Sequence, residues 1–172
     1  MSTEPDQYPS ALSQAISDDL VQHPVSGDVV RVVIRWFDGP LYLTIHALGT
    51  EDETEVSPED AWYPLEWPNL DAEIARADRI VAQPTVAATG ASVEATLDEG
   101  SWDWELDAPP GDLVAAASQI PDALRRAGVP LAQHFAVGVT HFEGWGAEAS
   151  VPLANEPSVV QALEQRGLLP DE

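Results

Sequence analysis

The 172-residue chain contains no cysteine and no lysine, so its seven basic residues are all arginine. The absence of cysteine excludes a disulfide framework, a thiolate metal site and a thiol nucleophile. No apolar run approaches the roughly 20 residues that a membrane helix needs. The opening residues 1–6 read Met-Ser-Thr-Glu-Pro-Asp and carry no basic, apolar targeting signal. These absences predict a cytoplasmic protein that does not associate with membranes.

Sequence motifs for common catalytic machinery are also missing. The chain has neither the G-x-S-x-G nor the S-x-x-K pattern of serine nucleophiles, and it has no H-E-x-x-H zinc motif. It also lacks G-x-G-x-x-G and the Walker A sequence, which bind the phosphates of nucleotides. We therefore assign no catalytic residue and no cofactor, and the sequence favours a protein that is not an enzyme.

Charge of one sign dominates the composition. Thirty carboxylates and seven arginines give a formal net charge of −23. The acids are spread evenly, with 16 acidic and 4 basic residues in positions 1–86 and 14 and 3 in positions 87–172. Such a chain repels nucleic acid. Three interpretations remain open: adaptation to solubility or salt, an acidic face that steers a basic partner, and a carboxylate-rich catalytic or metal site.

The composition predicts one folded domain. Hydrophobic residues make up 44% of the chain and charged residues 22%, which suffices for a core that offsets the entropy of ordering. Residues 1–9 are polar and contain proline, so we expect a flexible N-terminal arm followed by a single domain over 10–172. The fold class we expect is α+β, with a mainly antiparallel sheet built from hairpins and three to four helices packed on it.

Hydrophobic periodicity predicts the individual elements. Leu12, Ile16 and Leu20 share a stripe of a helix that begins near Ser10. Asn69 can cap a helix over 70–81, Asp112 can cap one over 113–127 that is interrupted or restarted at Pro121, and Gly128 suits its end. The remaining expected elements are hairpins over 28–48 and over 86–107, a strand over 134–142 and a helix over 155–166.

The segment 49–69 is the most distinctive part of the sequence. Six acids and no base lie between residues 51 and 60, and an aromatic, proline-rich stretch follows. A long loop without regular structure is uncommon in a small domain and tends to be functional. We therefore expect binding residues here, with Trp145 as an additional surface aromatic: Glu51, Asp52, Glu53, Glu55, Glu59, Asp60, Trp62, Tyr63, Trp67 and Trp145.

Trp145 and His141 lie in a segment with two open interpretations. Gly144 and Gly146 flank Trp145, so the ring is either exposed in a binding patch or packed over the sheet edge. His141 and Glu143 could share one face of a strand and bind a metal, or His141 could be a structural histidine. The sequence favours the structural alternative and predicts no metal site.

The segment Pro58-Glu59-Asp60-Ala61-Trp62 through Trp67, followed by the predicted helix 70–81, resembles a pattern in a family of small uncharacterised bacterial proteins that includes immunity proteins of polymorphic toxin systems. In that family the order is helix, hairpin, a Pro-Glu-x-Trp segment, helix and further strands. The present sequence has one additional residue between the glutamate and the tryptophan. The resemblance implies a binding function and no catalytic residues.

The leading hypothesis from the sequence is a non-enzymatic acidic protein that binds and neutralises a basic protein. Two alternatives belong to other classes: a carboxylate- or metal-dependent hydrolase, and a housekeeping protein with a salt-adapted surface. The sequence leaves the oligomeric state open.

Overall fold

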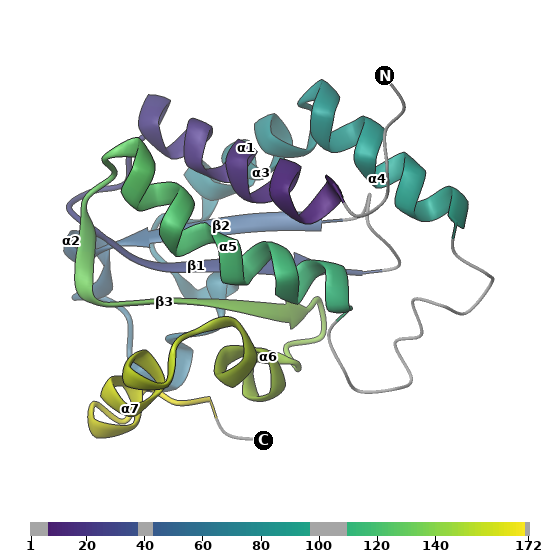
Figure 1. Cartoon of the computed structure of the whole chain (residues 1–172). Coiled ribbons are helices and arrows are strands. Elements are labelled where there is room, and N and C mark those ends of the chain that lie inside the picture. The colour runs from purple at the N-terminus through teal and green to yellow at the C-terminus, as the bar shows by residue number, and fades with distance from the viewer. Residues whose placement is uncertain (1–6, 38–42, 97–109, 171–172) are drawn as a thin grey trace.

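The computed structural model describes residues 7–37, 43–96 and 110–170. Its centre is a mixed sheet in the order β2-β1-β3, formed by β1 (Val29–Trp36), β2 (Leu43–Gly49) and β3 (Leu131–His141) (Figure 1). β1 pairs antiparallel with β2 and parallel with β3, with Ile34 opposite Ile45 on one side and Val139 on the other. The α+β class is thus confirmed, whereas a mainly antiparallel sheet describes only the β1–β2 pair. The described residues form seven α-helices, more than the three to four expected.

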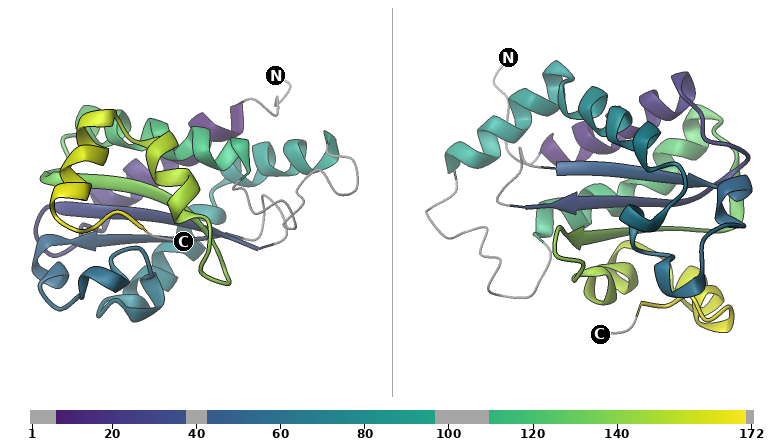
Figure 2. Two further views of the ribbon diagram at one scale, coloured as in Figure 1. Left: turned by 90° about the horizontal axis from the view of Figure 1, so that it is seen from below. Right: turned by 180° about the vertical axis from the view of Figure 1, so that it is seen from behind.

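Helices cover both faces of this sheet (Figures 1 and 2). One face carries α1 (Tyr8–Gln22) and α5 (Gly111–Ala127), with α3 (Leu70–Val81) along β2 and α4 (Pro84–Thr96) beside α1. The other face carries α6 (Ala147–Ala154) and α7 (Pro157–Gln165). Coverage on both faces explains why every residue of the central strand β1 is buried.

Alternation along β1, together with a register shift between Val29 and Arg31, divides the core between the two faces. Val32, Ile34 and Trp36 join the cluster under α1 and α5, to which Leu12, Ile16 and Leu20 of the predicted stripe contribute. Val30 and Val33 belong to a second cluster, which includes Trp62, Trp67 and Val151 of α6. Full burial of side chains of this size contributes about 1.5–3 kcal/mol each, so both faces stabilise the sheet.

The acidic segment after β2 contains short helical elements in place of the expected irregular loop. They are α2 (Thr50–Glu53) and the 3-10 turns η2 (Pro58–Asp60) and η3 (Pro64–Glu66). Each 3-10 turn has a proline in its first positions, where the missing N–H group leaves no bond unmade. These elements return the chain from the end of β2 to the face that α6 and α7 cover, where Trp62 and Trp67 join the core.

The hairpin expected over 86–107 is wrong in its first half, because residues 84–96 form α4. The buried residues Val86, Thr89, Gly90 and Val93 follow a helical spacing. The hydroxyl of Thr89 donates to the Thr85 carbonyl at 2.7 Å, which satisfies that polar side chain within the helix. The alanines of this segment favour a helix, and packing against α1 buries one face of it. The expected strand 101–107 lies outside the described residues.

The helices differ from the expectation in three details. α1 begins at Tyr8, and both Tyr8 and Pro9 are buried, so the helix takes up two residues that we assigned to the arm. α5 runs through Pro121 without a break and ends at Gly128, which has the expected left-handed conformation with φ of 78°. Asn69 does not cap α3, because its amide donates instead to the Ala47 carbonyl of β2 at 2.9 Å.

The helix α6 was not predicted from the sequence. It contains Pro152 and only eight residues, so its periodic signal is short.

Among the described residues, no helix combines the length and apolar character needed to cross a membrane.

Candidate functional site

A cleft of about 420 Å³ opens on the face of the sheet that α6 and α7 cover. Three segments far apart in the sequence form its walls: residues 58–63 around η2, residues 144–148 at the start of α6, and residues 167–170 after α7. Its volume falls within the range of ligand-binding sites, and its lining combines aromatic rings with carboxylates. We therefore treat it as the candidate site.

Trp62 is held in the wall of the cleft from two sides. Its indole N–H donates to the Leu168 carbonyl at 2.7 Å, which fixes the C-terminal segment against η2. The ring also lies against Gly138 of β3, where an added methyl group would be 2.8 Å from Cζ3 of Trp62. Only glycine leaves room for the indole at this close approach. The sequence predicts Trp62 as a binding residue; in the structure it is largely buried, with 8% of its surface exposed.

Tyr63 forms a second aromatic wall. It is partly exposed and packs on Gly144, where an added methyl group would be 3.1 Å from Cε2 of Tyr63. Gly144 has φ of 97°, a conformation that residues with a side chain rarely adopt. Gly144 therefore lets the segment before α6 approach the Tyr63 ring closely.

Two carboxylates line the cleft, Glu59 and Glu148. Both oxygens of Glu148 accept the Gly146 N–H at 3.2 Å, so the carboxylate is oriented but keeps further acceptor capacity. Glu59 is exposed. The described residues that line the cleft include no arginine. No sequence pattern relates Glu148 to Glu59, because 89 positions separate the two.

Behind the Trp62 ring lies a buried arginine. The guanidinium carbon of Arg31 is 5.1 Å from the centroid of Trp62, and Nη1 donates to the carbonyls of Val30 and His134 at 2.7 and 3.0 Å. Burial lowers the pKa of Arg31 to about 10; Glu53 opposes this shift and Arg166 adds to it. Arg31 therefore remains charged at neutral pH and places a cation on one face of Trp62.

Glu53 makes structural contacts with residues of the sheet. Its carboxylate lies 3.0 Å from Nε2 of His134 and 4.0 Å from Nη2 of Arg31. These contacts fasten α2 to the sheet. Of the ten predicted binding residues, Glu51, Glu55 and Glu59 are exposed, Asp52, Glu53, Asp60, Tyr63 and Trp145 are partly exposed, and Trp62 and Trp67 are buried. The cleft brings together only Glu59, Trp62 and Tyr63.

Trp145 and His141 lie in an aromatic cluster at the carboxyl end of β3. Their rings stack at 4.5 Å, and both contact Trp36 edge-on at 5.3 Å. The main-chain N–H of Glu143 donates to Nδ1 of His141 at 3.1 Å. Over the described residues, no group of three or more histidines and acids could hold a metal. The cluster therefore packs β1 against β3 through its rings.

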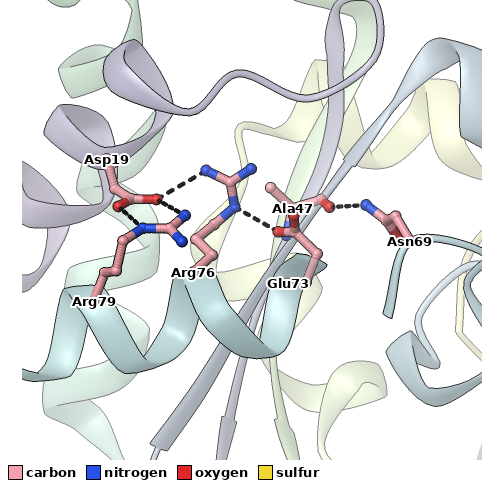
Figure 3. A network of polar contacts seen from close by, with 6 residues as sticks. All are labelled: Asp19, Ala47, Asn69, Glu73, Arg76 and Arg79. Atoms are coloured by element: carbon pink, nitrogen blue, oxygen red, sulfur yellow. Dashed lines mark hydrogen bonds and ion pairs between the residues drawn. The ribbon is translucent and has the colours of Figure 1, made fainter. Parts of the chain in front are cut away.

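A network of ion pairs lies at the α3 side of the sheet, away from the cleft (Figure 3). Arg76 donates to Asp19 of α1 at 2.9 Å and to Glu73 at 2.6 Å, and Arg79 donates to Asp19 at 2.9 Å. Glu73 also accepts the Ala47 N–H of β2 at 2.6 Å. Burial raises the pKa of Glu73, while Arg76 and the Ala47 N–H favour its ionised form. The acids and arginines of this network pair with one another, and their contacts join α1, α3 and β2.

No protein-family model, no curated protein and no solved structure matches this chain.

Proposed function

We propose that this protein binds a basic protein partner through the face that bears the cleft and the acidic segment 51–66. The observation that carries the proposal is the cleft itself, which combines two aromatic residues and two carboxylates with no cation in its described lining. Aromatic rings next to carboxylates favour a cationic group, because the ring faces and the carboxylates are both negative.

The charge around the cleft supports the same kind of partner. Between Arg35 and Arg76 the chain has no basic residue except His46. Glu51, Glu55, Glu59 and Glu66 are exposed along this stretch. A surface of one sign attracts an oppositely charged protein and accelerates association, and added salt screens that attraction. The weak resemblance to a family that includes immunity proteins agrees with such a role.

Selection from a displayed library of random peptides tests the proposal. We expect wild-type protein at low ionic strength to enrich basic peptides. The variant Glu51→Lys/Glu59→Lys should bind them at least about tenfold more weakly, because it replaces attraction by repulsion at the binding face.

A matched variant separates a specific face from general attraction to an acidic protein. Asp18→Lys/Asp122→Lys changes the net charge equally, and both residues are exposed on α1 and α5, two helices that do not line the cleft. This variant should bind the same peptides within about twofold of wild type. Equal weakening by both variants, or no enrichment of basic peptides, would contradict the proposed function.

A further inference from the structure

We propose that the cleft receives one arginine side chain of the partner, with its guanidinium group between Tyr63 and the carboxylates of Glu59 and Glu148. This inference rests on the proposed function, because it identifies the anchoring residue of the basic partner at that same face.

The shape and chemistry of the lining favour a guanidinium group over an ammonium group. A guanidinium is planar, stacks on aromatic rings and presents donors in a fork that matches a carboxylate. The partly exposed ring of Tyr63 offers a flat wall, and the carboxylate of Glu148 is held in place by the Gly146 N–H. An ammonium group is more strongly hydrated and gains less from both contacts.

Two of the protein's own guanidinium groups lie over aromatic rings. Arg31 lies over Trp62 at 5.1 Å, and Arg35 lies over the ring of Phe142 at 4.7 Å. Because Arg31 takes one face of Trp62, that ring is the rear support of the cleft. Tyr63 interacts electrostatically with Arg35, but its ring is partly exposed in the cleft lining and can contact a ligand.

Arg166 precedes Gly167 of the cleft wall and is close enough to Arg31 to lower its pKa. The positive charge of Arg166 repels a guanidinium group that enters the cleft. The inference therefore makes a directional prediction: removal of this charge should strengthen binding.

Titration of the ¹⁵N-labelled protein with Nα-acetylarginine methylamide, followed by NMR, tests the inference. We expect saturable shifts at the Trp62 indole N–H and at the main-chain N–H groups of Gly144 and Gly146, with none at Gly128. Nα-acetyllysine methylamide should bind more weakly, and the uncharged citrulline analogue should cause no saturable shift.

Variants locate the site. Glu59→Gln and Glu148→Gln should each weaken binding at least about threefold, since each removes a charge but retains an oxygen acceptor. Tyr63→Leu should weaken it similarly, Asp122→Asn should leave it unchanged, and Arg166→Gln should strengthen it about twofold. Glu59 is exposed and makes no structural hydrogen bond in the described part of the chain, so its substitution preserves the fold.

The outcomes separate this inference from the proposed function. Absent shifts, or equal shifts with citrulline, would overturn the inference while the peptide selection could still succeed through the wider face. If the NMR titration shows arginine-specific shifts but the selection yields no basic peptide, the guanidinium group does not come from a protein partner, and the proposed function is wrong. Arginine-specific shifts together with selected peptides that lose binding when their arginine is replaced by citrulline would support the inference.

Discussion

Trp62 donates its indole N–H to the main-chain oxygen of Leu168 at 2.7 Å, and 106 positions separate the two residues. This hydrogen bond joins the segment after α7 to Trp62, and both line the cleft. Leu168 and Leu169 also pack against the core cluster that contains Trp62. The tryptophan is therefore the link between the acidic segment and the C-terminal wall.

Trp62→Phe tests this link. The substitution retains most of the ring but leaves the Leu168 carbonyl without its donor, which should lower the free energy of unfolding by about 1–2 kcal/mol. Hydrogen exchange at Leu168 and Leu169 should accelerate. Trp67→Phe is the control, because it loses an indole bond to the Asp60 carbonyl instead. If both variants accelerate exchange at the C-terminal residues equally, the assigned link is wrong.

Gly138→Ala should disturb the cleft from the sheet side. The added methyl group would be 2.8 Å from the fixed Trp62 ring, so β3 or the indole must shift, and we expect a loss of about 1–3 kcal/mol in unfolding free energy. An alanine at Gly111 meets nothing within 4 Å, so Gly111→Ala should change stability by less than about 1 kcal/mol. Urea unfolding of the two variants measures both changes.

Asp19→Asn should be strongly destabilising. It removes a buried carboxylate that accepts from both Arg76 and Arg79, which leaves the buried Arg76 with Glu73 as its remaining anion. Breaking a buried ion pair on one side costs about 3–5 kcal/mol. Asp122→Asn breaks the exposed pair with Arg125 and should cost less than about 1 kcal/mol. Similar losses in the two variants would contradict the structural importance of the network.

His46 predicts a specific dependence of stability on pH. Burial, assisted by Arg35, lowers the pKa of His46 from 6.5 to about 4. Because the folded state binds this proton less tightly than the unfolded state, stability is highest above pH 6.5 and declines as the pH falls toward 4.

Between pH 7.5 and pH 4.5 the histidine should account for a loss of about 2.5 kcal/mol in unfolding free energy. His46→Gln removes this titration, so its unfolding free energy should fall less over the same range by about that amount. Urea unfolding at the two pH values measures the difference. Parallel declines in the variant and the wild type would show that His46 does not contribute.

The local elements of the fold could be predicted from the sequence where one periodic pattern dominates. Leu12, Ile16 and Leu20 define α1, and the long apolar run of β1 predicts a strand covered on both faces. The failures occur where two local patterns compete. In α4, β-branched residues are mixed with alanine, so the strand and helix patterns compete, and burial along α1 decides for the helix.

The sequence predicts only part of the candidate site. The acid and aromatic residues of the segment 51–67 can be identified from composition, and Glu59, Trp62 and Tyr63 do line the cleft. The inward direction of Glu53 and of Trp67 could not be identified, because it depends on contacts with His134 and with the core. Side-chain direction depends on partners that are remote in the sequence.

The sequence by itself determined the charge of the protein, its lack of thiol chemistry, its α+β class and the segment in which carboxylates and aromatic rings occur together. The tertiary structure decided that β3 pairs parallel with β1, which carries α6 and the segment after α7 to the face that holds Trp62. That pairing places Glu148 and Glu59 in one cleft. The physical reason is that strand order and crossover direction follow from burying both faces of the sheet at once, a property of the whole chain that no local spacing encodes.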